Sequence, residues 1–217
     1  MTSVRRLRIA AATAAASVLL AGCGLAGSHV GAEALGTPGI QQADQIMPVA
    51  PMSQSAWLKA VTKAYAHGPN GHTAEAWLAQ RAKQASPGQQ LAVVLGVDDV
   101  IVQTHFAGLN VLVNPSVQFV KTAQQLGYAV FYVTGRSGDT GLDKVENTLR
   151  SAGILANGVC GRPVGSASQE QGKAMCRSQI VKAGYTIAMS VAASEISFDG
   201  AYPAEADIPL PVFASRY

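Results

Sequence analysis

Short, continuous runs of apolar residues alternate along this chain with longer stretches in which apolar residues recur at helical spacing. The runs at residues 91–95, 128–133 and 185–191 predict strands that are buried on both faces, as in a parallel sheet. Helical spacing and end signals predict the helices, which span residues 53–65, 73–85, 114–126, 140–152 and 168–183. Because strands that alternate with helices form βαβ units, we expect an α/β fold: a three-layer Rossmann-like sandwich with a mostly parallel sheet and a helical N-terminal lead-in.

The N-terminal residues have the layout of an export signal. Three arginines among the first eight residues precede an uncharged, mostly apolar stretch at residues 9–20. The motif Leu20-Ala21-Gly22-Cys23 follows and resembles the lipobox of bacterial lipoproteins. We therefore expect residues 1–22 to be a signal peptide and Cys23 to be lipidated, with acyl chains such as palmitate. The alternatives are a soluble secretion signal and an uncleaved membrane helix, although a spanning helix needs roughly 20 apolar residues.

The remainder divides into a tether and one domain. Residues 23–50 carry many Gly, Ala, Pro and Gln without sustained periodicity, which is typical of a flexible tether. Residues 51–217 are long enough for a single domain with its own core. We expect this domain to be displayed on the extracytoplasmic side of the cell membrane or outer envelope, where buried acyl chains supply about 0.8 kcal/mol per CH₂ group.

The charge of the chain changes once the signal is set aside. Residues 1–22 hold three arginines and no acidic residue, so the rest of the chain has 13 basic and 13 acidic side chains. This balance gives no basis for binding nucleic acid. The membrane, through the lipid, is therefore the one partner that composition indicates.

Two further cysteines, Cys160 and Cys176, lie in the expected domain. In an oxidising compartment they can form a disulfide that closes a loop of about 15 residues and adds about 3 kcal/mol in the chain-entropy model. The alternative is two free buried thiols. No cluster of His and Cys has the spacing of metal ligands, so we expect no zinc site.

Polar residues follow the predicted strands, at the sheet edge where α/β proteins place functional groups. Gly96-Val97-Asp98-Asp99 follows the first strand, Thr134-Gly135-Arg136 follows the second, and Lys173 opens the segment that leads to the third. In order and spacing, the chain from about Trp57 to its end resembles the acid phosphatase branch of the haloacid dehalogenase superfamily, which includes bacterial lipoprotein phosphatases and plant vegetative storage proteins. The segments that carry the resemblance are residues 91–99, 130–136, 172–177, 184–187 and 209–213.

The resemblance implies a role for three of these residues. Phosphatases of this family use an aspartate nucleophile at the end of the first strand and a second acid, two residues later, that protonates the leaving group. A hydroxyl after the second strand and a lysine hold the phosphoryl oxygens. Asp98 matches the general acid, Thr134 the phosphate-binding hydroxyl and Lys173 the charge-stabilising lysine.

The remaining positions of the family pattern are not kept. Gly96 stands at the nucleophile position, and Ala193 and Ser197 stand where acidic residues help to bind Mg²⁺; Glu195 and Asp199 are near but out of register. Losing a covalent nucleophile costs about a millionfold in kcat, or about 8 kcal/mol. We therefore expect a degenerate acid phosphatase without a cofactor, with Mg²⁺ relevant only if the site is active.

Taking Asp98 as the nucleophile does not restore a catalytic pair, because Val100 then stands at the acid position.

Each retained residue also has a plainer interpretation. Asp98 and Asp99 can cap a turn, and Thr134-Gly135-Arg136 can be a turn into a loop. Lys173 can be a solvated helix lysine, and His105 is better explained as a loop or packing residue than as a base.

Three hypotheses of function follow. The first is a non-catalytic binding or interaction protein, with a pocket for a phosphate-like small anion around Thr134 and Lys173. The second is a weak or altered phosphomonoesterase that works through Asp98. The third is a structural envelope lipoprotein with a vestigial cleft. The first is the one that the joint loss of nucleophile and metal ligands favours.

Overall fold

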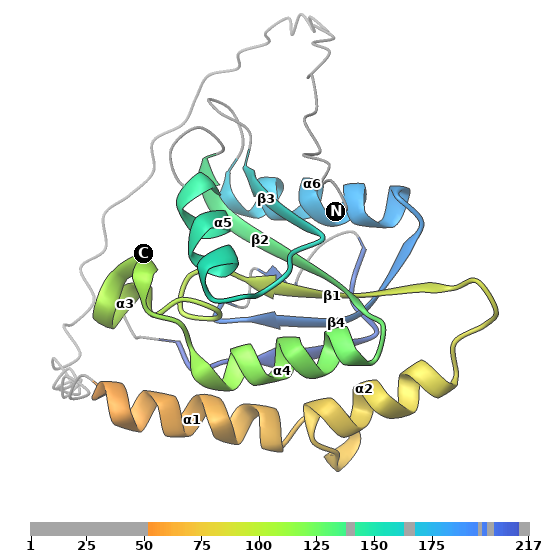
Figure 1. Ribbon diagram of the computed structural model, residues 1–217, viewed down its shortest axis with the longest axis horizontal. Coiled ribbons are helices and arrows are strands. Elements are labelled where there is room, and N and C mark those ends of the chain that lie inside the picture. Colours follow the sequence, from red (N-terminus) through yellow and green to blue (C-terminus); the bar gives the residue numbers. More distant parts are fainter. Residues whose placement is uncertain (1–51, 138–141, 163–167, 195–196, 199–201, 213–217) are drawn as a thin grey trace, which may run out of the picture. The chain divides into compact units, whose positions relative to one another are not determined.

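Within the described residues the sheet has five strands, and their pairs are all parallel. A computed structural model describes residues 52–137, 142–162, 168–194, 197–198 and 202–212. The strand order is β3-β2-β1-β4-β5 (Figure 1). The bounds are β1 Gln90–Gly96, β2 Ala129–Ser137, β3 Gly158–Arg162, β4 Tyr185–Ala192 and β5 Ala206–Pro209.

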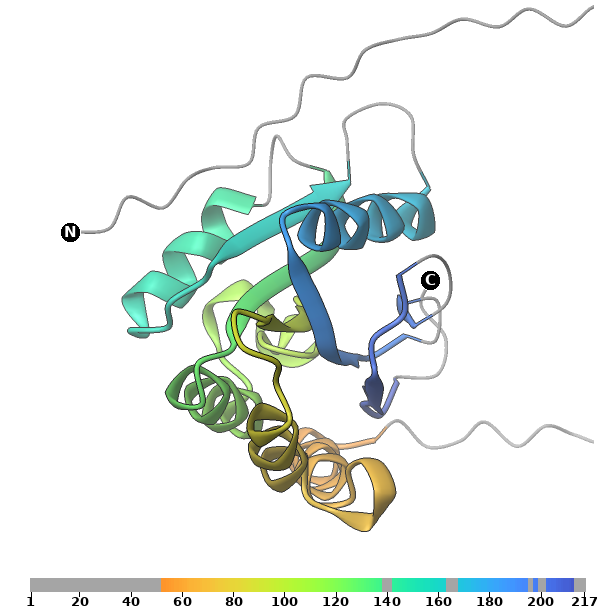
Figure 2. The same cartoon turned by 90° about the vertical axis from the view of Figure 1, so that its right-hand side faces the viewer.

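Helices cover both faces of this sheet. α1 (Gln54–Ala66), α2 (Ala74–Lys83) and α4 (Asn114–Gln125) pack on one face, and α6 (Gln169–Lys182) packs on the other (Figures 1 and 2). The remaining helical elements are α5 (Leu142–Ser151), the short α3 (Thr104–Ala107) and the 3₁₀ turns Pro69–Gly71 and Gly108–Asn110. The expected three-layer α/β sandwich is confirmed.

Local signals explain where the helices begin and end. Ser53 and Thr73 accept hydrogen bonds from the backbone N–H groups three residues on, and so cap α1 and α2. Ser168 and Gln171 form a reciprocal capping box at the start of α6. Gly184 follows α6 with φ +94°, a left-handed conformation that glycine adopts without steric cost. The sequence predicted each of these three helices from the same signals.

Side chains that alternate along β1 divide the core in two. Leu91, Val93 and Leu95 pack with the α1, α2 and α4 layer, whereas Ala92 and Val94 pack under α6. The lead-in helices belong to the larger of these clusters. The Trp57 side chain on α1 is fully buried, and its Nε1 donates to the Pro211 carbonyl at 3.3 Å. The domain is therefore closed by contacts between its first helix and its last described residues.

The sequence prediction of three strands was incomplete, because it missed β3 and β5 at the two edges of the sheet. β3 (Gly-Val-Cys-Gly-Arg) contains two glycines and is only half-buried, so it has no apolar run. β5 has four residues, ends in proline, and buries only Ile208. β2 also continues beyond its predicted end through Ser137, so Thr134 and Arg136 lie within the strand rather than in a following loop.

Of the two alternatives for the cysteines, the structure has the disulfide. Cys160 on β3 and Cys176 on α6 are bridged, with their Cα atoms 5.8 Å apart. The expected signal peptide, the lipidated Cys23 and the tether lie outside the described residues, as do Glu195 and Asp199. No helix in the described ranges is long and apolar enough to cross a membrane.

Candidate functional site at the carboxyl edge of the sheet

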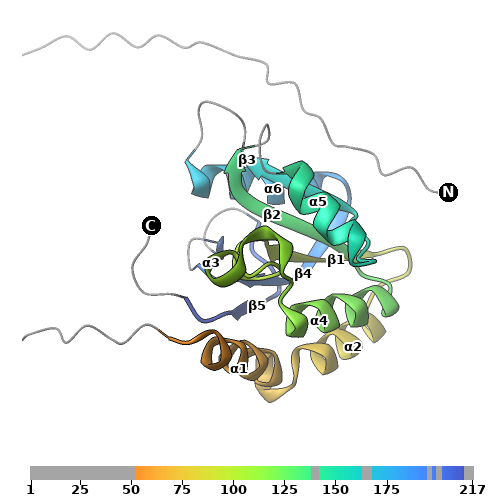
Figure 3. The ribbon, with the colours of Figure 1, turned by 60° about the vertical axis from the view of Figure 1, so that its left-hand side comes forward.

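A tight turn follows β1 and separates two neighbouring carboxylates. The backbone N–H of Asp99 donates to the Val102 carbonyl at 2.9 Å, and Asp99 has φ +54°, in the left-handed region. α3 begins directly after the turn and lies at the end of the sheet toward which the strands point (Figure 3). Asp98 and Asp99 consequently face different surroundings, as the alternation of a strand would require.

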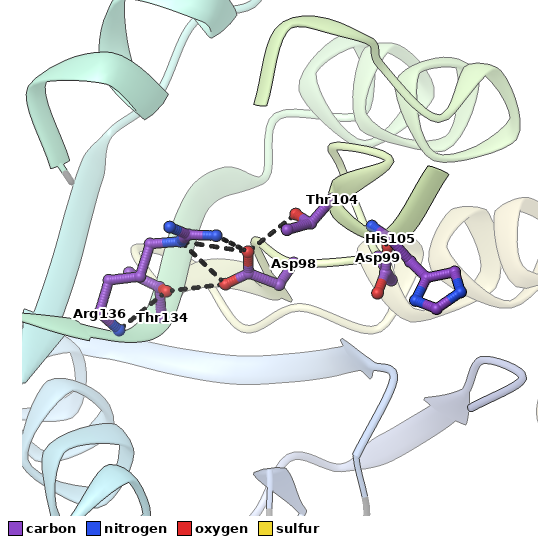
Figure 4. A network of polar contacts seen from close by, with 6 residues as sticks. All are labelled: Asp98, Asp99, Thr104, His105, Thr134 and Arg136. Carbon is purple, nitrogen blue, oxygen red and sulfur yellow. Dashed lines mark hydrogen bonds and ion pairs between the residues drawn. The ribbon is translucent and has the colours of Figure 1, made fainter. Parts of the chain in front are cut away.

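The Asp98 carboxylate is surrounded by hydrogen-bond donors (Figure 4). Its Oδ1 accepts from Thr104 Oγ1 at 2.8 Å, and its Oδ2 accepts from Thr134 Oγ1 at 3.3 Å. The Arg136 guanidinium donates to both oxygens through Nε, at 3.1 and 3.2 Å, and to Oδ1 also through Nη2. Donors from β2 and α3 therefore converge on one carboxylate that follows β1, and the Asp98–Arg136 ion pair is about one-quarter to one-third exposed.

Asp99 has a structural role in this turn. Its Oδ1 accepts from the backbone N–H of His105 at 2.9 Å, and its burial raises the pKa of this carboxyl above the ordinary value. The His105 ring lies edge-on to Phe106, with centroids 5.1 Å apart. Of the two acidic residues that could cap a turn, Asp99 is the one that does so. His105 packs against Phe106, as the packing interpretation proposed.

The α6 side of the edge carries two cations. Lys173 Nζ donates to Ser197 Oγ at 2.8 Å, and the buried Arg177 donates through Nη2 to Ser190 Oγ at 3.2 Å. Burial lowers the pKa of Lys173, with a smaller lowering by Arg177, while the charge of Asp98 opposes both. Lys173 is thus coupled to Asp98 through electrostatics, without a hydrogen bond between them.

Gly96 ends β1 beside these groups. A Cβ atom placed on Gly96 would lie 3.0 Å from Val100 Cγ2 and 3.7 Å from the Val191 carbonyl oxygen. The turn that follows β1 folds Val100, which is buried, back against the glycine. The space beside Gly96 is therefore partly filled by a valine side chain.

The structure brings some of the predicted site residues together and adds others. Asp98 and Thr134 are hydrogen bonded, whereas Lys173 faces Ser197. Sequence reasoning gave no role to Arg136, although its position two residues after Thr134 on a strand places both side chains on one side. Arg177 follows Lys173 by one helical turn, so the same kind of spacing could have found it.

Mg²⁺ is the cofactor that the expected chemistry implies, and it takes oxygen ligands, mostly carboxylates. Among the described residues at this edge, Asp98 is paired with Arg136 and Asp99 is turned to His105. The groups facing the α6 side are cations and serine hydroxyls. The described residues therefore do not fit a Mg²⁺ site, and the described ranges contain no group of three or more His, Cys, Asp or Glu side chains placed to hold a metal.

Comparison with known proteins finds a family match for part of this domain. Residues 107–211, just under half of the chain, match the family described as HAD superfamily, subfamily IIIB (acid phosphatase). The match includes Thr134, Lys173 and both bridged cysteines, while Gly96 and Asp98 precede it. No curated protein matches this chain.

Two solved structures align with this chain at low identity. Chains titled "Structure of the Pnkp1/Rnl/Hen1 RNA repair complex" and "Structure of Pnkp1/Rnl/Hen1 complex" superpose with TM-scores of 0.50 and 0.49 and are each 16% identical to this chain. Each alignment covers 60% of this chain and less than half of the solved one, 45% and 48% respectively. At this identity the likeness concerns the fold alone.

The parallel sheet, with polar groups at its carboxyl edge, makes this an α/β domain with a Rossmann-like fold. Its residues 107–211 match the subfamily IIIB acid phosphatases of the HAD superfamily.

Proposed function

We propose that this chain is a lipid-anchored cell-envelope protein whose acid phosphatase domain binds a phosphate-like anion and does not hydrolyse phosphomonoesters. The observation that carries the proposal is Gly96 at the end of β1, where the family resemblance requires the nucleophile. A covalent phosphoryl transfer needs an attacking side chain at that position. Gly96 has none, and Val100 packs against the space that one would use.

The surroundings of Asp98 support the same proposal. A general acid has to present its proton to the leaving group within hydrogen-bond reach. Both Asp98 oxygens already accept hydrogen bonds from the chain itself, from Thr104, Thr134 and Arg136. Asp98 in this arrangement orders the edge of the sheet rather than donating a proton.

Anion binding is supported by the cations that remain. Arg136 is a forked donor suited to phosphate, and Lys173 contributes a point charge that burial has partly removed from water. An incoming phosphate-like anion competes with Asp98 for Arg136 and Thr134. Binding therefore involves a change of partner for Arg136, not the filling of a preformed gap.

Phosphomonoester hydrolysis by the purified full chain tests the loss of catalysis. We expect no turnover from acid to neutral pH, with or without Mg²⁺, and no change in Asp98→Asn. The Gly96→Asp/Val100→Ala variant tests whether a carboxylate at the nucleophile position is sufficient by itself; because the described residues do not fit a Mg²⁺ site, we expect no turnover from this variant either. Mg²⁺-dependent turnover that Asp98→Asn abolishes would instead establish a phosphatase working through Asp98.

Calorimetric titration with inorganic phosphate tests the binding role. We expect saturable binding that Thr134→Val weakens, because the variant loses the hydroxyl while keeping the shape of the side chain. Thr62→Val is the matched control, since Thr62 lies exposed on α1 and bonds only to its own helix at the Leu58 carbonyl. Equal affinity in Thr134→Val and Thr62→Val would rule out this pocket and leave a vestigial cleft.

Metabolic labelling tests the anchor separately from the domain. Radioactive palmitate supplied to expressing bacteria should be incorporated into the parent chain and not into Cys23→Ser. The variant should also leave the membrane fraction. Label retained in Cys23→Ser would contradict lipidation at this residue without affecting the proposal for the domain.

A further inference from the structure

The helix layer formed by α1, α2 and α4 exposes lysines but no fully exposed carboxylate (Figures 1 and 2). Four exposed lysines lie on these packed helices: Lys59 and Lys63 on α1, Lys83 on α2 and Lys121 on α4. We call these four residues the lysine face. None of them has an ion-pair partner among the described residues. The single acidic residue of the three helices, Glu75, is only partly exposed.

The periodicity of α1 sets the direction of its two lysines. Trp57, Val61 and Tyr65 are buried and recur every four residues, so they form one stripe against the core. Lys59 and Lys63 each follow a member of this stripe by two residues, which is about 200° around the helix axis. Both lysines of α1 therefore point away from the sheet, on the outer side of the layer.

Other helices of the domain do not share this bias. α5 exposes Asp143 together with Lys144 and Arg150, and α6, on the opposite face of the sheet, exposes Glu170 together with Lys182. Because the chain after the expected signal has equal numbers of basic and acidic side chains, the lysine face reflects the distribution of charge and not its total. Such a surface is complementary to a partner that is itself an extended negative surface.

The lysine face begins at the helix that is nearest along the chain to the proposed anchor. Ser53 caps α1, and 29 residues, numbers 24–52, separate it from Cys23. Even when fully extended, 29 residues reach only about 100 Å. A domain tied to a bilayer in this way meets the lipid surface at a high effective concentration, so a weak attraction is sufficient for docking.

We propose that the lysine face docks on the surface of the anionic phospholipid bilayer in which the chain is anchored at Cys23. The inference rests on the lipid anchor of the proposed function and uses no property of the Asp98 site. Lysines near anionic headgroups are attracted to them, over a distance of about 10 Å at about 0.1 M salt. Docking leaves α6, on the opposite face of the sheet, turned to solvent.

Acylation rates of single lysines, followed by mass spectrometry, test the docking. The full chain is reconstituted through its lipid in vesicles of phosphatidylcholine, or of equimolar phosphatidylcholine and phosphatidylglycerol. We expect Lys59, Lys63 and Lys121 to react at least about fivefold more slowly on the anionic vesicles. Lys182, on α6, is the internal control and should react equally on both.

Salt provides the second part of this test. About 1 M salt should remove the difference between the two kinds of vesicle, because the screening length falls to about 3 Å. Equal rates for the lysine face on both kinds of vesicle would overturn the proposal. Equal slowing of Lys182 would overturn it as well, since the slowing would then not belong to one face of the domain.

Two variants separate the lysine face from net charge. Lys63→Gln and Lys182→Gln each remove one exposed lysine from the last turn of a helix. Lys63→Gln should lower the docking equilibrium constant about fivefold, read from the protection of Lys59 and Lys121, whereas Lys182→Gln should leave it unchanged. Equal weakening in the two variants would overturn the proposal.

Two further readouts distinguish the anchor and other partners from the docking. Palmitate label in the same preparation reports the anchor: a chain without label overturns both proposals, whereas a labelled chain with equal lysine rates overturns the docking alone. Dissolved polyglutamate, added to the phosphatidylcholine vesicles, tests for a soluble acidic polymer. Slowing of Lys59 and Lys63 by polyglutamate but not by anionic vesicles would assign the face to such a polymer and overturn the proposal.

Discussion

The side chain of Val100 packs against Gly96, four residues earlier in the chain, so closely that a Cβ atom on Gly96 would lie 3.0 Å from Val100 Cγ2. The contact is formed within one turn, because the N–H of Val100 points back to the Val97 carbonyl at 3.4 Å. A residue with a side chain at position 96 thus requires the neighbouring valine to move. The size of the side chain at position 96 and the position of Val100 therefore depend on each other.

Restoring an aspartate at position 96 should therefore destabilise the domain, by about 1 to 3 kcal/mol, as overpacked cores do. Val100→Ala should reduce this penalty, and the double-mutant cycle should give a coupling of at least about 0.5 kcal/mol. Denaturant unfolding of the two single variants and the double variant measures it. Val102→Ala, another fully buried valine of the same turn, serves as the control and should not couple to Gly96→Asp.

Asp99 should make the stability of the domain depend on pH in acid. Burial raises its folded pKa above the ordinary 3.8, so the folded state binds this proton more tightly than the unfolded chain. The resulting stability is present below pH 3.8 and is lost as pH rises through the folded pKa. Asp99→Asn cannot titrate, yet it keeps an acceptor for His105 and tolerates the left-handed backbone.

The free energy of unfolding of the parent minus that of Asp99→Asn should consequently fall as pH rises from 3.8 through the raised, folded-state pKa of Asp99. Urea titrations at several pH values measure the difference, in which the other carboxylates cancel. A difference that rises with pH would show that hydrogen bonding to the ionised form outweighs burial. Asp99→Ala should cost more at every pH, because alanine is strained at φ +54°.

Sequence patterns could predict the central strands and the capped helices, because continuous apolar runs and Ser or Thr caps are local signals. They could not predict β3, whose glycines permit close contacts: a Cβ on Gly161 would lie 2.6 Å from the Arg136 carbonyl oxygen. That requirement comes from a neighbouring strand and leaves no apolar pattern in β3 itself.

The same division holds for the site. Asp98, Thr134 and Lys173 could be selected because they follow strands or precede them at a family spacing. Their partners could not, since the bond from Thr104 to Asp98 depends on the turn that follows β1, and the bond from Lys173 to Ser197 joins residues on either side of β4. The sequence thus identifies side chains that could bind or react with a phosphoryl group. Which of these side chains are in contact is determined by the tertiary fold.

The Arg136–Asp98 pair should contribute measurably to stability. It is neither fully exposed nor buried, so its value should fall between the two limits, at about 1 to 2 kcal/mol for Arg136→Met. The Arg136→Met/Asp98→Asn variant should recover part of this loss, because no unpaired carboxylate remains. Arg150→Met is the control. Arg150 is largely exposed and its contact with Glu146 is long, at 4.0 Å, so this substitution should have almost no effect on stability. Equal losses in the two arginine variants would contradict the importance of the pair.

The disulfide should stabilise the domain and also position Lys173. Cys176 lies one helical turn after Lys173, and a Cβ on Gly172 would be 2.4 Å from Arg162 Cβ, so α6 is held close to β3 on both sides of the lysine. Reduction of the bond should cost about 3 kcal/mol, as expected for a loop of this length. Thermal unfolding with and without a reductant measures this loss.

The Cys160→Ser/Cys176→Ser variant separates the bond from other effects of the reductant. Its midpoint should match that of the reduced parent and should not respond to the reductant. Hydrogen exchange should in addition show faster exchange in the first turns of α6 than in α4, which the disulfide does not touch. Unchanged protection of α6 after reduction would mean that the close packing of Gly172 against Arg162 is sufficient to hold the helix, and that the disulfide acts only on the unfolded chain.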